Sequence, residues 1–105
     1  MQFERYILKN AVGERIASLA TTRSETLLDC LLRNDRPIKT TCYGSLICGG
    51  CRVVVEEGRE ALAPASRFEL EILARVARDE PRARLACQVV LPEGVSEITV
   101  STSYW

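Results

Sequence analysis

Four of the five cysteines in this 105-residue chain have a spacing that suits a metal centre. Cys42, Cys48 and Cys51 fall within ten residues, and Cys87 comes thirty-six positions after Cys51. Written as spacing, this is C-x5-C-x2-C-x35-C, in a chain that contains no histidine. Thiolates are soft ligands that suit iron–sulfur clusters and zinc. The four cysteines therefore predict a metal site built from sulfur ligands alone.

The number and arrangement of these thiols favour a [2Fe–2S] cluster. A two-iron cluster takes two cysteines on each iron, which accounts for all four. Three ligands on one loop keep the entropy cost of ordering the chain low, and a fourth from a distant strand ties the site to the fold. Three glycines in the loop at 38–51 allow the backbone to wrap closely and to direct N–H groups at the sulfurs. We therefore expect the cluster to be bound by Cys42, Cys48, Cys51 and Cys87.

Length and composition predict a single domain at residues 1–105. Apolar residues make up 47% of the chain and charged residues 27%, as in ordinary folded proteins. The formal net charge is zero, so the bare chain shows no electrostatic footprint for nucleic acid or for an anionic membrane. We find no signal peptide and no run of the ~18 apolar residues that a membrane helix needs. We therefore expect a monomer in the cytoplasm, where an odd number of cysteines does not indicate disulfides.

The segment before the cysteine loop predicts a β-hairpin and one helix. Strands are expected at 2–9 and 15–22, with a glycine turn between them. Ser24 is the expected N-cap of the helix, and Pro37 is expected to end it. The apolar stripe of this helix consists of Leu27, Leu28, Leu31 and Leu32. Cys30 lies in the same helix, where we expect a small buried group and not a metal ligand.

The segment after the loop predicts a strand at 52–58 and a second helix. Ser66 and Glu69 form an S-x-x-E capping box at the start of this helix, and Pro81 is expected to end it. Its expected inner face consists of Phe68, Ile72, Leu73, Val76 and Ala77. Its expected solvent face consists of Glu71, Arg75, Arg78 and Asp79.

The C-terminal part predicts two further strands, at 85–91 and 97–100, with a turn at 92–94 between them. The order of elements is thus β-β-α, a glycine-rich loop, then β-α-β-β. Strands grouped with helices in this way indicate the α+β class, here a small mixed sheet with two helices packed against it.

Three features together are similar to those of a known family. The C-x5-C-x2-C loop, the sequence Arg-Leu-Ala-Cys-Gln at 84–88 and the Ser-x-x-Glu helix before it resemble the [2Fe–2S] ferredoxins of the adrenodoxin and bacterial type. Plant-type ferredoxins have one residue fewer between the first two cysteines. The resemblance implies a β-grasp fold. It also implies that Cys42 and Cys48 hold the outer iron, and Cys51 and Cys87 the inner one.

The resemblance further implies a soluble one-electron carrier that is not itself an enzyme, taking electrons from a ferredoxin reductase and passing them to a redox acceptor enzyme. The chain shows no nucleophile beside an evident base and no phosphate-binding loop. An alternative with the same cluster is a redox sensor, in which the cluster or Cys30 reports oxidation to a partner. A structural zinc site is less favoured. Zinc modules usually supply their ligands as two close pairs, and here only Cys48 and Cys51 form such a pair.

The chain departs from this family in its charge. Adrenodoxin-like proteins present a strongly acidic second helix to their partners, whereas residues 66–84 here mix four acidic residues with five arginines. Lys39, Arg52 and Arg84 also lie close in sequence to the predicted ligands. These cations are either an ordinary solvated surface, or they attract an acidic partner and raise the potential of the cluster.

Overall fold

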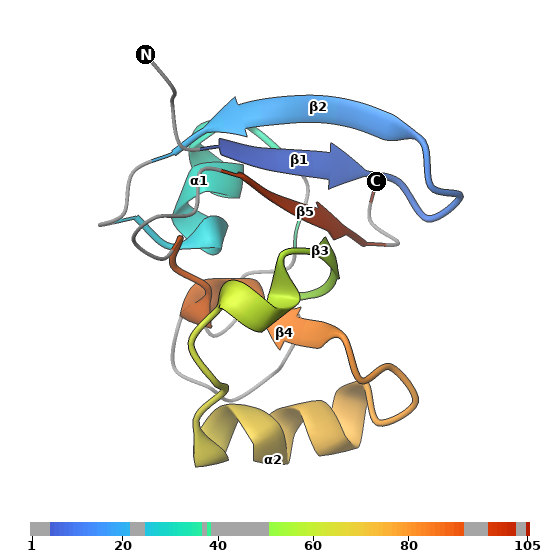
Figure 1. Cartoon of the computed structure of the whole chain (residues 1–105), viewed down its shortest axis with the longest axis vertical. Helices are drawn as coiled ribbons and strands as arrows, with labels where there is room; N and C mark the ends of the chain where they lie inside the picture. The colour runs from blue at the N-terminus through green and yellow to red at the C-terminus, as the bar shows by residue number, and fades with distance from the viewer. Residues whose placement is uncertain (1–4, 22–24, 37, 39–50, 92–96, 103–104) are drawn as a thin grey trace.

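The computed structural model describes residues 5–21, 25–36, 38, 51–91, 97–102 and 105, and these residues form one five-stranded sheet with two α-helices. The strands are β1 (Arg5–Lys9), β2 (Arg15–Ala20), β3 (Arg52–Glu57), β4 (Ala83–Leu85) and β5 (Glu97–Ser101). The helices are α1 (Leu27–Arg33) and α2 (Arg67–Val76), with short 3-10 helices η1 (Arg59–Ala61) and η2 (Ala86–Gln88). Figure 1 shows these elements in their spatial arrangement.

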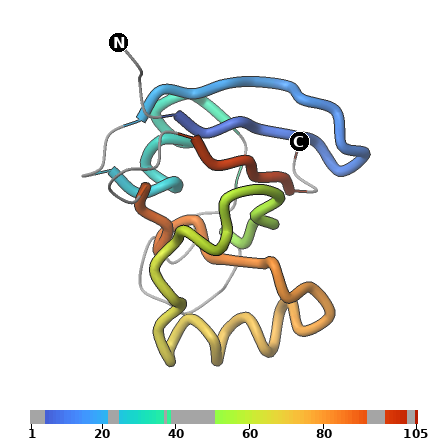
Figure 2. Tube along the Cα trace, in the orientation of Figure 1, coloured from blue at the N-terminus to red at the C-terminus, as the bar shows by residue number. Residues whose placement is uncertain are grey.

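The sheet is mixed and has the strand order β2-β1-β5-β3-β4. β1 and β5 are parallel, whereas the three other neighbouring pairs are antiparallel. The hairpin of β1 and β2 forms one edge, and α2 lies beyond β4 at the other edge, as the Cα trace also shows (Figure 2). This mixed sheet with two helices confirms the predicted α+β class and the β-grasp fold.

The turn residues explain why the N-terminal segment forms a hairpin. Gly13 has a φ of +90°, a left-handed conformation that glycine adopts at little cost. The Asn10 side-chain oxygen accepts hydrogen bonds from the backbone N–H groups of Val12 and Glu14, at 3.1 and 3.0 Å. The predicted strands are therefore confirmed over 5–9 and 15–20; residues 2–4 and 22 lie outside the described residues.

Helix α1 has different ends from those predicted. Its N-cap is Thr26 and not Ser24, since the Thr26 hydroxyl accepts a hydrogen bond from the backbone N–H of Asp29 at 3.1 Å. The helix ends at Arg33, before Pro37 is reached, in a Schellman motif centred on Asp35 with φ of +57°. The backbone N–H groups at 35 and 36 donate to the carbonyl groups of residues 32 and 31, respectively, at 3.1 and 2.9 Å. The prediction that Pro37 ends the helix was wrong, because the chain turns earlier.

The core lies between the sheet, α1 and the segment after β4. β5 is buried from Ile98 to Ser101, because it is the central strand and both of its faces are covered. In α1, three of the four predicted leucines are buried, whereas Leu32 is 38% exposed and was wrongly assigned to the inner face. Trp105 packs against this core from the C-terminal end.

The predicted strand at 85–91 is only partly a strand. β4 stops at Leu85, and the chain then makes the 3-10 turn η2. Beyond η2, Val90 forms an isolated β-bridge with Thr26 and is not part of a longer strand. The final strand β5 is confirmed and extends one residue further than predicted, to Ser101. The predicted turn at 92–94 lies outside the described residues.

Candidate metal centre

Two of the four predicted ligands, Cys51 and Cys87, meet at one end of a strand pair. Cys51 immediately precedes β3, and Cys87 lies in η2, two residues after β4 ends. β3 and β4 are antiparallel, with Arg52 opposite Leu85, so the start of one strand lies beside the end of the other. The backbone N–H of Ala86 donates to the Cys51 carbonyl at 3.0 Å and extends this pairing to the cysteines. Residues thirty-six positions apart in sequence are thereby brought together.

The site is buried and apolar, which suits a cluster that must be kept from water. Cys51 is 2% exposed and Cys87 8%, and Ala86 between the strand and the second thiol is fully buried. The other two predicted ligands, Cys42 and Cys48, lie outside the described residues, as does Lys39. Among the residues that the structure describes, no group of three or more side chains that could hold a metal ion is found.

The 3-10 turn η2 places a hydrogen-bond donor on one of these thiols. The side-chain amide of Gln88 donates to Cys87 Sγ at 3.4 Å. A donor to a cluster ligand stabilises negative charge on the sulfur and thereby influences the reduction potential. The sequence analysis missed this contact because it expected an extended strand, in which neighbouring side chains point to opposite faces.

A buried ion pair ties α2 to the strand that leads to Cys87. The Arg84 guanidinium donates to both carboxylate oxygens of Glu69, through Nε at 2.8 Å and Nη2 at 3.1 Å. Glu69 also accepts from the backbone N–H of Leu85 at 3.0 Å, and Arg84 Nη1 donates to the Ala63 carbonyl at 3.0 Å. The Glu69 side chain is 1% exposed and that of Arg84 11%. A pair buried to this degree persists because nearly all its polar atoms are hydrogen-bonded.

This ion pair corrects two predictions. Ser66 is the N-cap of α2, as predicted, and its hydroxyl accepts from the backbone N–H of Glu69 at 3.2 Å. The Glu69 side chain, however, does not return to Ser66 as a capping box requires; it turns inward to Arg84. Arg84 is consequently not a surface cation, whereas Arg52 is exposed.

The residues on the buried face of α2 differ from those predicted. Ile72 and Leu73 are buried, but Phe68 is 59% exposed, with the Arg67 guanidinium 5.6 Å from its ring centre. The inner stripe therefore runs through Glu69 and not through Phe68. The solvent face is confirmed, since Glu71, Arg75, Arg78 and Asp79 are exposed. The helix ends at Val76, well before Pro81, so the prediction that Pro81 ends it was wrong.

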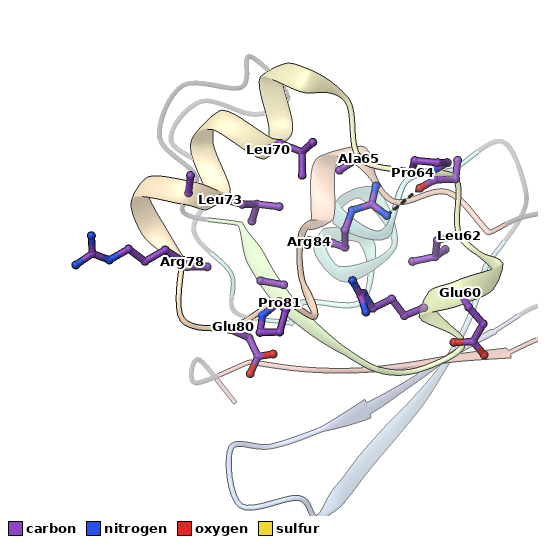
Figure 3. A pocket seen from close by; sticks show the side chains of 15 residues that line it. Glu60, Leu62, Pro64, Ala65, Leu70, Leu73, Arg78, Glu80, Pro81 and Arg84 are labelled. Carbon is purple, nitrogen blue, oxygen red and sulfur yellow. Dashed lines mark hydrogen bonds between the residues drawn. The ribbon is translucent and has the colours of Figure 1, made fainter.

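Beside α2 lies a cavity of about 700 Å³. Its wall is largely apolar and includes Leu62, Leu70 and Leu73. Figure 3 shows Arg84 at this cavity, with the hydrogen bond to the Ala63 carbonyl drawn as a dashed line. Arg84 therefore both lines the cavity and holds the buried Glu69 carboxylate.

Cys30 has surroundings of a different kind. It is fully buried in α1, as predicted, and its Sγ lies 3.5 Å from the Ala20 carbonyl, to which the thiol donates. The side-chain amide of Asn34 lies 3.9 Å from the same sulfur. Burial raises the pKa of the Cys30 thiol, and the nearby Glu25 carboxylate raises it further. Cys30 is therefore a neutral thiol at physiological pH.

Comparison with known proteins places the chain in a family. Residues 13–92 match the 2Fe-2S iron-sulfur cluster binding domain. The chain belongs to this family. The cofactor is accordingly a [2Fe–2S] cluster, which decides against the zinc alternative, and the resemblance to [2Fe–2S] ferredoxins is confirmed.

Individual relatives agree with this assignment. A 2Fe-2S ferredoxin of Pseudomonas aeruginosa is 38% identical over 69 residues, which cover 66% of this chain and 62% of that protein. The chain thus spans somewhat under two thirds of the length of this relative. The crystal structure of a ferredoxin from Rhodopseudomonas palustris HaA2 superposes with a TM-score of 0.82 and 20% identity, covering 93% of this chain and 94% of that one. Putidaredoxin in its covalent complex with putidaredoxin reductase gives a TM-score of 0.77 and 23% identity, with 93% and 96% coverage.

Neither α-helix in the described ranges has the length and apolarity needed to cross a membrane.

Proposed function

We propose that this chain is a one-electron carrier whose [2Fe–2S] cluster is bound by Cys42, Cys48, Cys51 and Cys87. The observation that carries this proposal is the convergence of Cys51 and Cys87 at the end of the β3–β4 pair, in a chain of the 2Fe-2S family. Both thiols are buried among apolar residues, and such surroundings suit two ligands of the same iron. The loop with the other two cysteines immediately precedes Cys51 in sequence.

The chain supplies a rigid frame for this chemistry. A bound [2Fe–2S] cluster accepts and releases single electrons, with a potential set by the hydrogen bonds and solvent around it. Leu85 and Ala86 exclude water from the side of the two described ligands, and the Gln88 amide offers a hydrogen bond to Cys87 Sγ. The Glu69–Arg84 pair fixes α2 against β4 and so keeps the end of that strand in position.

The partners in this proposal are a reductase that supplies the electron and an acceptor enzyme that takes it up. The similarity in fold to putidaredoxin, which forms a complex with its reductase, supports a reductase as the donor. We propose that both partners bind transiently and that the chain works as a monomer.

Reductive titration of the cluster-loaded protein under anaerobic conditions tests this function. We expect the visible absorption to bleach with one electron per chain and to recover fully on reoxidation. The same titration of a Cys30→Ser variant serves as the control, because that sulfur lies outside the proposed ligand set. Loss of the cluster on the first reduction, or an uptake of two electrons per chain, would contradict a one-electron carrier.

A further inference from the structure

A second groove lies on the surface between β3, the end of α2 and the end of β5, and adjoins the cavity of Figure 3, with which it shares Ala77, Arg78, Glu80 and Ala83. Its volume is about 450 Å³. Its apolar lining consists of Val53, Val54, Val76, Ala77 and Ala83. Ser101 and Thr102 add polar groups at the end of β5. The groove therefore offers apolar contact to a ligand that also carries polar groups.

Three arginines surround this groove, and they are Arg52, Arg75 and Arg78. All three are exposed, and within the described part of the chain none of them forms an ion pair or a side-chain hydrogen bond. Arg78 also lines the first cavity, from which its side chain extends outward (Figure 3).

The described residues that line the groove set two carboxylates against these three arginines. Glu80 is paired with Arg82, whose Nε lies 3.0 Å from its Oε1 and whose Nη1 also lies 3.3 Å from Glu56 Oε2. Asp79 is the other carboxylate in the lining. The groove thus carries an excess of positive charge, although the chain as a whole is neutral.

The position of Arg52 connects the groove to the cluster site. Arg52 follows Cys51 directly and lies opposite Leu85 in the β3–β4 pair, two residues before Cys87. One end of the groove therefore lies at the residue that adjoins Cys51, at the end of the β3–β4 pair where Cys51 and Cys87 lie. Close approach to the cluster is what electron transfer between proteins requires.

We propose that this groove docks a carboxylate-bearing segment of the protein that exchanges electrons with the cluster. This inference rests on the proposed function, because it assigns the docking surface of an electron carrier. Guanidinium groups without internal partners attract carboxylates and can bind them in a bidentate manner. The apolar lining accommodates an aliphatic side chain between two carboxylates of the partner. A cationic patch of this kind also accelerates the encounter with an acidic partner at low ionic strength.

Binding of an acidic peptide to the cluster-loaded protein tests the proposal. The probe is a capped peptide in which four glutamates flank one central leucine, and its glutamine counterpart is the charge control. Binding is followed by NMR, on the amide signals of Val76, Ala77 and Thr102. We expect R75Q/R78Q to weaken the peptide affinity by at least about fivefold, the effect of losing two interface charges.

A matched variant separates local from general electrostatics. R5Q/R15Q also removes two positive charges, from the β1–β2 hairpin, and neither residue lines the groove or lies opposite a groove residue in the sheet. We expect this control to change the affinity by less than about twofold, and rising salt to weaken binding to the unmodified chain. Because the assay involves no electron transfer, its result is independent of the reductive titration, and failure of the two proposals can be told apart.

Three outcomes would overturn the proposal. The first is an absence of peptide binding to the unmodified chain. The second is an equal loss of affinity in R75Q/R78Q and R5Q/R15Q, which would mean attraction by overall charge. The third is binding of free citrate as tight as that of the peptide, which would mean a site for small anions only.

Discussion

Buried thiols occur in two regions of this molecule, and their surroundings differ. At the end of the β3–β4 pair, Cys51 and Cys87 are brought together by strand register, and the neighbouring polar groups are hydrogen-bonded. Between α1 and the hairpin, Cys30 is just as buried but donates to a main-chain carbonyl. Beside it, the Tyr6 hydroxyl is buried without a hydrogen-bond partner among the described residues. Burial alone therefore does not distinguish a ligand from a structural thiol, and the proposal rests on the convergence of Cys51 and Cys87.

The largest expected effect separates the two regions by their cysteines. Cys87→Ser should abolish or severely destabilise the cluster, because an alcohol is a poor ligand for iron in place of a thiolate. Cys30→Ser should leave the visible spectrum unchanged. Visible absorption and circular dichroism of both variants, purified anaerobically side by side, check this. Loss of the spectrum in the Cys30 variant would transfer the ligand role to α1.

The next effect concerns the buried ion pair. Glu69→Gln should lower the free energy of unfolding by about 3–5 kcal/mol, because Arg84 is left as an uncompensated buried charge. Removing Arg5 from its exposed pair with Glu97 should cost less than about 1 kcal/mol. Chemical denaturation of the two variants, in the same redox state, measures both values. Equal losses would mean that Glu69 and Arg84 are better solvated than their burial indicates.

In the other region, Tyr6→Phe should be neutral or should stabilise the protein by up to about 1 kcal/mol. The hydroxyl that is removed lies in the core without a partner among the described residues, so its desolvation is uncompensated. Burial also raises the pKa of Tyr6 far above its ordinary value. Thermal denaturation gives the answer, and a clear loss of stability would reveal a partner for the hydroxyl.

A smaller effect is expected on the potential. Gln88→Leu removes the donor to Cys87 Sγ and should lower the reduction potential by about 20–60 mV, the equivalent of one hydrogen bond in a one-electron couple. Gln88→Glu, which has a similar size but lacks the amide donor, should lower it as well. Spectroelectrochemical titration measures both shifts. An unchanged potential in both variants would show that this contact does not influence the cluster.

The smallest expected effect is a pH dependence near α1. Hydrogen bonds from Arg33 at 2.8 and 2.9 Å hold the pKa of Glu25 below its ordinary value. A carboxyl whose pKa is lowered by folding contributes stability above its unfolded pKa and loses it as the pH falls. The difference in unfolding free energy between the unmodified chain and Glu25→Gln should thus be present at pH 6–7 and should disappear below about pH 4. Urea unfolding at several pH values tests this, and a difference that widens in acid would reverse the sign.

Much of the fold was accessible from local patterns. Strand alternation, the Gly13 turn and the Ser66 N-cap all depend on neighbouring residues, and each was confirmed. Errors arose where a distant segment decides the outcome. The predicted buried face of α2 included Phe68. The set Glu69, Ile72, Leu73 and Val76 also has the spacing of one helix face. A carboxylate in that stripe was a signal that a buried cation must lie opposite it.

The kind of cofactor was predictable from the sequence, whereas the geometry around Cys51 and Cys87 was not. Cysteine spacing indicated a cluster, because sulfur ligation depends on residue type and number. The hydrogen bond from Gln88 and the burial of Arg84 depend on η2 and on the approach of α2 to β4. Such contacts between segments leave no periodic pattern in the sequence.

Iron, zinc and acid-labile sulfide per chain, determined on anaerobically purified protein, test the central claim most directly. The structure and the family predict two irons and two sulfides per chain, with little zinc. One zinc per chain without sulfide, persisting after reconstitution with iron and sulfide, would contradict the cluster site and the electron carrier built upon it.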